Sequence, residues 1–334
     1  MRLHGLGLDL TGWFQVGWSA DLGPGDVQAM RYFGQDLVAW RDEDGAVHIQ
    51  GRYCQHLGAS LAHGGQVTAA GIRCPFHGWV WDGEGRNVEI PYQDRVNKAR
   101  KLSCWHVAEL NESIYLWHDA AGRAPLWAVP DALASGVHVA RCDFYPLTEE
   151  ARVRFPGLRV HPQMVAENAV DAHHFRFVHG TPASPVVLEE RLDGPVWWSR
   201  VGFGRGWSES PTGPDGAVRT DSANTIEILW SGLGVSVNTE HTRDGVRVVA
   251  VNTTPVEDGV TEMFTTYWVG RGDGDAPADH GRRLAEAKAA VPDDLNIWDH
   301  QIYLDPPGLA TEEGRAFRRM RRWAHQFYND HDPS

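Results

Sequence analysis

Two short segments, each with one cysteine and one histidine, constrain this chain more than any other feature. They are Cys54-Gln55-His56 and Cys74-Pro75-Phe76-His77, with seventeen residues between them. Two thiolates and two imidazoles can complete a four-ligand metal site. Zinc accepts this donor set, but zinc ribbons favour cysteine pairs within one short motif. One cysteine and one histidine per segment suit a two-iron cluster, in which one iron takes both thiolates and the other takes both imidazoles.

The residues around these ligands favour the iron–sulfur interpretation. Gly51-Arg52-Tyr53 precedes the first segment, and Gly78-Trp79 follows the second. The run CQH followed by CPFHGW resembles the signature of Rieske proteins. The resemblance implies a [2Fe–2S] cluster bound by Cys54, His56, Cys74 and His77. The remaining cysteines, Cys104 and Cys142, lack such neighbours and are expected to be buried, inert thiols.

Composition narrows the functional class. Four cysteines in 334 residues are too few for a disulfide-dependent secreted protein. The first residues carry no signal-peptide pattern, and no apolar run approaches the ~18 residues of a membrane helix. A cytoplasmic location without a membrane span is therefore expected. The net charge of −13 argues against nucleic acid as a partner.

The hydrophobic pattern predicts two domains and an α+β fold. Residues 12–118 show short strands and turns, with hairpins predicted at 36–49 and 79–90 and a strand at 113–117. A linker rich in glycine and proline at 119–131 separates residues 1–120, an all-β Rieske domain, from residues 121–334. The second domain combines strands within 185–270 with helices predicted at 162–179, 281–303 and 312–328, an antiparallel-sheet-and-helix (helix-grip-like) arrangement.

A second set of candidate ligands lies in the segment from Glu167 to His179. His174 and His179 are five residues apart, about 140° around an ideal helix, so a local irregularity must bring them together. Two histidines and one carboxylate with open positions form the facial triad of non-haem Fe(II) oxygenases. The carboxylate must come from distant sequence. The candidates are Asp294, which precedes the pair Ile297-Trp298, and the alternatives Asp293 and Asp299.

The segment resembles the N-x₂-D-x₂-H-x₄-H motif of Rieske non-haem iron oxygenases, filled by Asn168, Asp171, His174 and His179. The resemblance implies a single iron bound by the two histidines and Asp294, with His173 directed elsewhere. It also implies that Asp171 hydrogen-bonds a cluster-ligand histidine, His56 or His77, of a neighbouring subunit. The alternative is that Asp171 only orients His174.

The C-terminal run from Ile297 to Tyr328 resembles the oxygenase component of 3-ketosteroid 9α-hydroxylase and the related cholesterol desaturases. This implies a homotrimer of one chain type. The chain contains no Gly-x-Gly-x-x-Gly fingerprint, so electrons from NAD(P)H would come from a separate reductase, with or without a ferredoxin. The aromatic residues Trp230, Phe264, Tyr267 and Trp268 are candidate walls of a pocket for an apolar substrate, and each is alternatively a core residue.

The predicted function is therefore that of a Rieske monooxygenase component. It would use O₂ to hydroxylate a small apolar molecule, for which a steroid-like or polycyclic skeleton is the candidate. Desaturation and oxidative demethylation begin at the same C–H bond and compete with this prediction. Two functions of a different kind are further alternatives to this prediction: a Rieske electron carrier and a zinc-binding structural protein. The arginine cluster Arg315, Arg318, Arg319, Arg321 and Arg322 is either a solvated helix face or a docking patch for an acidic partner.

Overall fold

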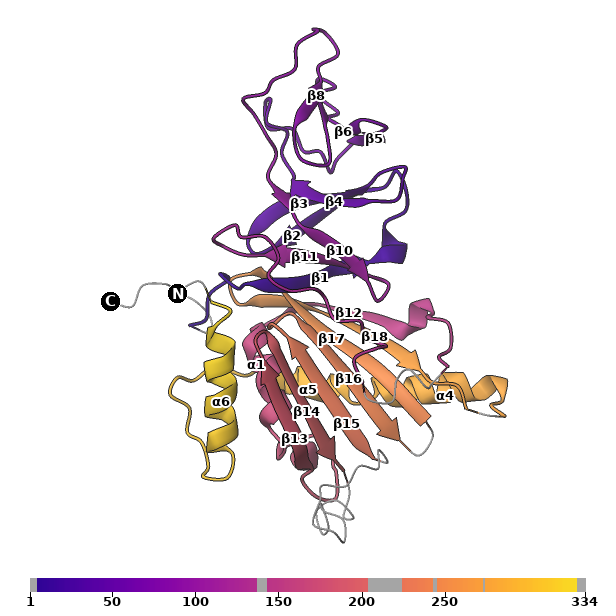
Figure 1. Ribbon diagram of the computed structural model, residues 1–334, viewed down its shortest axis with the longest axis vertical. Coiled ribbons are helices and arrows are strands. Elements are labelled where there is room, and N and C mark those ends of the chain that lie inside the picture. Colours follow the sequence, from indigo (N-terminus) through magenta and orange to yellow (C-terminus); the bar gives the residue numbers. More distant parts are fainter. Residues whose placement is uncertain (1–4, 137–142, 204–223, 243–244, 273, 329–334) are drawn as a thin grey trace.

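A computed structural model describes residues 5–136, 143–203, 224–242, 245–272 and 274–328 (Figure 1). Small sheets occupy one end of the molecule, and a seven-stranded sheet with helices occupies the other. The predicted α+β fold class is confirmed. Within the described residues, no helix combines the length and the apolar character needed to cross a membrane.

The N-terminal domain consists of three small antiparallel sheets, ordered β1-β11-β10, β2-β3-β4-β9 and β5-β6-β7-β8. Its elements are β1 (Gly12–Trp18), η1 (Ser19–Asp21), β2 (Val27–Tyr32), β3 (Gln35–Arg41), β4 (Val47–Gly51), β5 (Gln66–Thr68), β6 (Gly71–Arg73), β7 (Val80–Trp81), β8 (Asn87–Glu89), β9 (Cys104–Trp105), β10 (Val107–Leu110) and β11 (Ser113–His118). The predicted hairpins are β3–β4 and β7–β8, and the predicted strand at 113–117 is β11. All three sequence predictions are confirmed.

The C-terminal domain is one antiparallel sheet with the strand order β12-β18-β17-β16-β15-β14-β13. Its strands are β12 (Arg152–Leu158), β13 (Val186–Asp193), β14 (Val196–Gly202), β15 (Thr225–Ser231), β16 (Val235–Thr242), β17 (Gly245–Glu257) and β18 (Val260–Val269). Its helices are η3 (Glu149–Ala151), α1 (Pro162–Glu167), η4 (Asn168–Val170), α2 (His174–Phe177), α4 (Pro277–Lys288), α5 (Val291–Trp298) and α6 (Gly314–His325). In Figure 1, α4 and α5 lie behind the sheet.

The continuous helix predicted at 162–179 is wrong, because the segment is divided into α1, η4 and α2. Asp171 leaves the helical conformation, with φ −93° and ψ 84°. Its carboxylate instead accepts hydrogen bonds from the backbone amides of His173 and His174, at 3.1 and 3.2 Å. Aspartate commonly competes with the helix in this way. The irregularity required to bring the two histidines together is therefore present.

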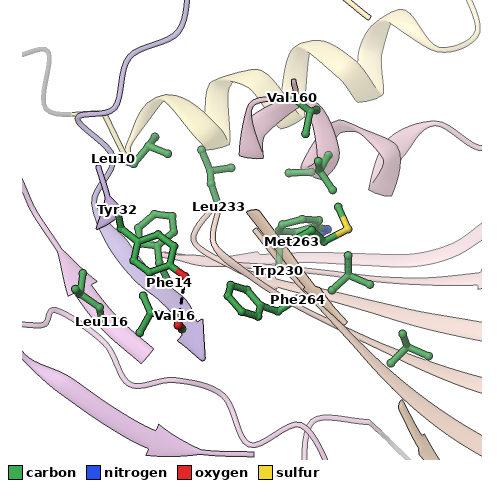
Figure 2. Packing of buried hydrophobic residues seen from close by; sticks show 14 of the residues in the cluster. Leu10, Phe14, Val16, Tyr32, Leu116, Val160, Trp230, Leu233, Met263 and Phe264 are labelled. Carbon is green, nitrogen blue, oxygen red and sulfur yellow. Dashed lines mark hydrogen bonds between the residues drawn. The ribbon is translucent and has the colours of Figure 1, made fainter. Parts of the chain in front are cut away.

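The two domains share one hydrophobic core. Figure 2 shows Phe14 and Val16 of the N-terminal domain packed beside Trp230 and Phe264 of the C-terminal sheet. Buried polar contacts also cross the boundary: Trp18 Nε1 donates to Thr266 Oγ1 at 2.9 Å. A shared core of this kind fixes the orientation of one domain on the other.

Among the buried polar contacts between the two domains, the one made by Tyr32 involves a charged carboxylate. Its hydroxyl donates to Glu262 Oε2 at 2.5 Å, and Arg154 pairs with the same carboxylate at 2.6 and 2.9 Å. Burial raises the pKa of Tyr32 well above its ordinary value. We expect Tyr32→Phe to lower the free energy of unfolding by about 1.5–3 kcal/mol, the typical contribution of a hydrogen bond to a charged group. Urea denaturation of both proteins measures this, and an unchanged midpoint would contradict it.

Candidate metal centres and cavity

The two Cys/His segments form loops of the same conformation. The amides of Cys54 and Cys74 each donate to the carbonyl five residues ahead, at 2.9 and 2.8 Å. The amides of Gly58 and Gly78 donate back to the carbonyls of the two cysteines, at 2.9 and 3.1 Å. Both glycines have positive φ, and a Cβ on Gly78 would lie 2.7 Å from Pro91 Cγ. Glycine is therefore required at the end of the second loop.

The four side chains of these loops fit a metal cluster. Cys54 and Cys74 are 2% and 3% exposed. The rings of His56 and His77 lie 4.6 Å apart between centroids, and His56 stacks on Trp79. Nδ1 of His77 is buried without a hydrogen-bond partner in the described structure. Such a nitrogen is costly unless something binds it, and a metal ion would do so.

The sulfur of Cys54 is buried and accepts a hydrogen bond from a tryptophan. Burial raises the pKa of the Cys54 thiol to about 11. Trp81 Nε1 donates a hydrogen bond to Cys54 Sγ at 3.3 Å. Hydrogen bonds to sulfur are one of the ways in which a protein tunes an iron–sulfur cluster.

A second candidate metal centre consists of His174, His179 and Asp294, whose ligand atoms all lie within 4.8 Å of one another. Nε2 of His179 is 3.2 Å from Asp294 Oδ1. The hydrogen bond to Asp294 raises the pKa of His179, whereas burial lowers the pKa of His174. Two imidazoles and one carboxylate are the donor set of non-haem Fe(II) sites.

The broken helix orients the first of these histidines. Nδ1 of His174 contacts the backbone carbonyl of Asp171. A carbonyl only accepts hydrogen bonds, so Nδ1 carries the proton and Nε2 keeps its lone pair for a metal. Asp171 therefore positions His174 twice, through this carbonyl and through the carboxylate that accepts from the backbone amides of His173 and His174.

The structure separates the three candidate acids. Asp294 lies beside His179, and its side chain is 16% exposed. The Asp293 side chain is 59% exposed and lies 3.9 Å from Nδ1 of His179. Asp299 accepts a hydrogen bond from the backbone amide of Arg159 at 2.8 Å, a structural role. Among the described residues, only Asp294 completes the three-residue cluster.

Two residues close to the histidines in sequence, His173 and Asn168, lie in different surroundings. The ring of His173 contacts Ser184 Oγ at 3.0 Å and lies 3.7 Å from Glu312, away from the cluster. Asn168 lines a cavity that also contains His174, His179 and Asp294. The placement of Asn168 allows it to contact a bound substrate.

The cavity has a volume of about 370 Å³, within the usual size of small-molecule sites. Trp230 lines it, as predicted. For Phe264, Tyr267 and Trp268 the structure selects the alternative of core residues, because these residues of β18 do not line the cavity. Phe264 packs against Trp18 instead, with ring centroids 5.3 Å apart, and all three fill the core.

Sequence reasoning missed polar residues in the same cavity. Asn238, Glu240 and Arg247 project from β16 and β17 into it. Every second residue of β16 from Ser236 to Thr242 is polar and lines the cavity. Because Thr239 and His241 between them are polar as well, β16 has no strict alternation that would have marked its cavity face.

Two further predictions change with the structure. Cys104 is exposed, not buried, because it lies on the short strand β9 at a sheet edge. Cys142 lies outside the described residues. In the arginine cluster, Arg321 pairs with Glu167 at 2.9 and 3.0 Å, and Arg319 pairs with Glu190. These two arginines therefore hold α6 against the domain.

Comparison with known protein families decides the identity of the chain. Residues 12–105 match the Rieske [2Fe–2S] domain, and residues 116–328 match the 3-ketosteroid 9alpha-hydroxylase C-terminal domain. The chain is a Rieske oxygenase of this family. It is an oxidoreductase, the oxygenase component of its system.

Relatives of this Rieske oxygenase span nearly its whole length. It is 27% identical over 351 residues to a cholesterol 7-desaturase of Hemicentrotus pulcherrimus, covering 97% of this chain and 70% of the desaturase. It is 29% identical over 334 residues to a probable 3-ketosteroid-9-alpha-monooxygenase oxygenase component of Rhodococcus rhodochrous, covering 96% and 80%.

Solved structures share the fold of this Rieske oxygenase. Dicamba monooxygenase bound to dicamba superposes with a TM-score of 0.68 at 17% identity, covering 96% of this chain and 97% of the other. Pseudomonas putida CBB5 NdmA with caffeine superposes with a TM-score of 0.67 at 18% identity, covering 94% and 89%. The α+β architecture is therefore that of Rieske oxygenases.

Proposed function

We propose that this chain hydroxylates a small, largely apolar molecule, using O₂ and electrons that a separate NAD(P)H-dependent reductase supplies. The observation that carries the proposal is the cluster of His174, His179 and Asp294 at the wall of a cavity. An iron bound by these three residues would supply oxygen activation at an open coordination position. The neighbouring apolar side chains exclude water and hold the substrate beside it.

The Rieske ligands in this proposal are Cys54, His56, Cys74 and His77, as the sequence predicts. The unpartnered Nδ1 of His77 and the two buried thiols support this assignment. A [2Fe–2S] cluster there would take one electron at a time from the reductase. The cytoplasmic location remains a prediction.

The placement of the two candidate centres within one chain favours an assembly of several copies, such as the predicted homotrimer. In Figure 1, the sheet β5–β8, beside the cluster loops, occupies the far end of the N-terminal domain, and the sheet β1-β11-β10 lies between it and the catalytic sheet. Exposed apolar side chains flank both candidate centres. They are Tyr53, Leu57, Phe76 and Tyr92 near the cluster loops, and Phe177, Ile297, Ile302 and Leu304 on the catalytic domain. Exposed apolar patches mark interfaces, so we infer that the cluster end of one subunit docks on the catalytic domain of the next, beside Asp171.

Desaturation of the substrate is a second candidate. Cholesterol 7-desaturases are relatives over 97% of this chain. Both reactions begin with loss of hydrogen from the same carbon, so the same residues would serve either. A pure electron carrier is disfavoured, because it has no need of a second set of three ligands beside a cavity.

The proposal is tested with the purified chain, a surrogate reductase, NADPH and ¹⁸O₂. We expect about three irons and two acid-labile sulfides per chain. Mass spectrometry of apolar test substrates should show one ¹⁸O in the product for hydroxylation and loss of two hydrogens for desaturation. Zinc in a colourless protein, or two irons with no further uptake of Fe(II), would contradict it.

Trp81 offers a test of the cluster that does not require substrate. We expect Trp81→Phe to lower the reduction potential by about 20–60 mV. The hydrogen bond from Trp81 to Cys54 Sγ stabilises the reduced cluster, which carries the more negative charge, and the variant removes this bond. The loss of about 0.5–1.5 kcal/mol of stabilisation corresponds to this shift in potential for a one-electron reduction. Spectroelectrochemistry measures it. Trp105→Phe, on a strand outside the cluster loops, is the control, and a potential unchanged in Trp81→Phe would contradict the assignment.

A further inference from the structure

A chain of tryptophans begins at the wall of the cavity. Trp230 on β15 lines the cavity, and Trp197 stands directly opposite it on β14. Residues opposite each other in an antiparallel pair share one face of the sheet, with Cβ atoms about 4.5–5.5 Å apart, so two indoles placed there touch. Both side chains are buried. Trp230 therefore joins the cavity to an indole that does not line it.

The C-terminal helix α6, which lies beside the β13–β14 edge of the sheet in Figure 1, continues this chain. The ring centroids of Trp197 and Trp323 are 5.8 Å apart, and those of Trp323 and Phe327 are 4.9 Å apart. Phe327 then contacts Trp127 of the linker, with centroids 5.8 Å apart. Trp127 is partly exposed, and the side chain of Leu126 beside it is 61% exposed. The aromatic chain thus runs from the cavity to the surface.

The surroundings of these indoles suit a positive charge. Indole is the side-chain ring that attracts cations best, because it is the most electron-rich, and for the same reason it gives up an electron readily. Nε1 of Trp323 donates to the backbone carbonyl of Gly194 at 3.1 Å, and the negative end of that dipole stabilises a positively charged ring. Arg319 lies 5.4 Å over the ring of Trp197, but the carboxylate of Glu190 pairs with this arginine and balances its charge.

We propose that the tryptophans from Trp230 to Trp127 carry oxidising equivalents out of the cavity when no substrate is bound. An oxidant derived there from O₂ or peroxide takes one electron from Trp230 and is reduced by that electron. Trp197 and Trp323 each pass one electron inward in turn, and Trp127 takes one from a thiolate in solution, which becomes a thiyl radical. Without a thiolate, Trp127 loses a second electron, gains the oxygen of a water molecule, releases two protons and becomes hydroxytryptophan. This inference goes beyond the proposed function and rests on it only for the place where the oxidant forms.

The test locates oxidised tryptophans by peptide mass spectrometry, which does not depend on turnover of a substrate. The holoprotein is treated with hydrogen peroxide in the absence of substrate and thiol. We expect hydroxytryptophan at Trp127, at the far end of the chain. Asp294→Ala, which lacks the carboxylate of the three-residue cluster, supplies the background of oxidation that does not begin in the cavity. Trp298 also lines the cavity but lies on α5, so its oxidation reports the oxidant independently of the chain.

Two variants interrupt the chain at different points. In Trp197→Phe, oxidation of Trp127 should fall to the background of Asp294→Ala, and oxidation of Trp230 should rise. Trp323→Phe should also protect Trp127, with Trp197 now oxidised. Loss of packing cannot produce opposite changes at the two ends of the chain. The matched control is Trp198→Phe, because Trp198 neighbours Trp197 in sequence but points to the other face of β14, and this variant should keep the wild-type pattern.

The outcomes distinguish the inference from the proposed function. Oxidation of Trp127 that disappears in both interrupted variants supports the route, even if no substrate is oxygenated. Oxidation of Trp298 and Trp230 that does not reach Trp127 in the wild type, or that reaches it equally in the interrupted variants, overturns the route. Oxygenation of a substrate by a protein whose Trp127 stays unmodified would support the proposed function and refute only the route. The same oxidation in wild type and Asp294→Ala, with no product from any substrate, would overturn both.

Discussion

Replacing Asp294 by alanine is expected to lower the iron content from about three to about two per chain and to abolish product formation. The variant removes the carboxylate of the three-residue cluster, and its loss leaves two imidazoles to hold the metal. Activity should fall at least about a hundredfold, since even residues that only orient a ligand contribute about 10–100-fold. Metal analysis and product quantification on the same preparation measure both effects. The visible absorption of the cluster should remain, because Asp294 lies in the other domain.

The neighbours of Asp294 supply the controls. Asp293→Ala removes an exposed carboxylate one residue away, and His173→Ala removes an imidazole next to His174 that contacts Ser184. Both variants should keep about three irons and most of the activity. Equal iron content in Asp294→Ala and Asp293→Ala would show that the ligand set is wrong.

The sequence specifies the local geometry of the cluster loops more fully than the arrangement of His174, His179 and Asp294, for a physical reason. Each cluster loop is local: a cysteine, a histidine and a glycine within five residues fix its hydrogen bonds, and the glycine must adopt positive φ. The motif therefore contains most of the information needed for its geometry. By contrast, Asp294 lies more than a hundred residues from His179, and its position depends on how α5 packs behind the sheet.

Packing also explains the incorrect predictions. The pattern at 162–179 is helical, but the carboxylate of Asp171 forms better local hydrogen bonds by interrupting the helix. The aromatic residues Phe264, Tyr267 and Trp268 were equally suited to a pocket wall or to a core, and only the position of β18 decided between them. A local sequence pattern cannot decide between these alternatives, because tertiary packing determines which one forms.

Asp171→Asn is expected to lower product formation about 10–100-fold while both metal centres stay loaded. Asparagine can still accept the two hydrogen bonds from the backbone amides of His173 and His174, so His174 should keep its position. The variant loses the negative charge of Asp171, which is proposed to accept a hydrogen bond from a cluster-ligand histidine of the next subunit. Stopped-flow spectroscopy should show normal reduction of the cluster by the reductase and slowed reoxidation in the presence of substrate and O₂. Full activity of the variant would assign to Asp171 only the orienting role.

A mixture of two chains, each with strongly reduced activity, tests whether the electron crosses between subunits. Asp171→Asn retains the cluster ligands but lacks the connecting carboxylate, whereas His77→Ala retains Asp171 but lacks a cluster ligand. If the route runs between subunits, mixed oligomers place an intact cluster beside an intact Asp171, and co-expression should restore activity to well above that of either parent. If the route runs within one chain, no mixed oligomer contains a complete route, and activity should stay at the level of the parents.

Co-expression of Asp294→Ala with Asp171→Asn is the control. Neither chain has both an intact iron site and its own Asp171, so both models predict no recovery. Restoration in the first mixture and none in the second would therefore assign the electron transfer to the interface between subunits.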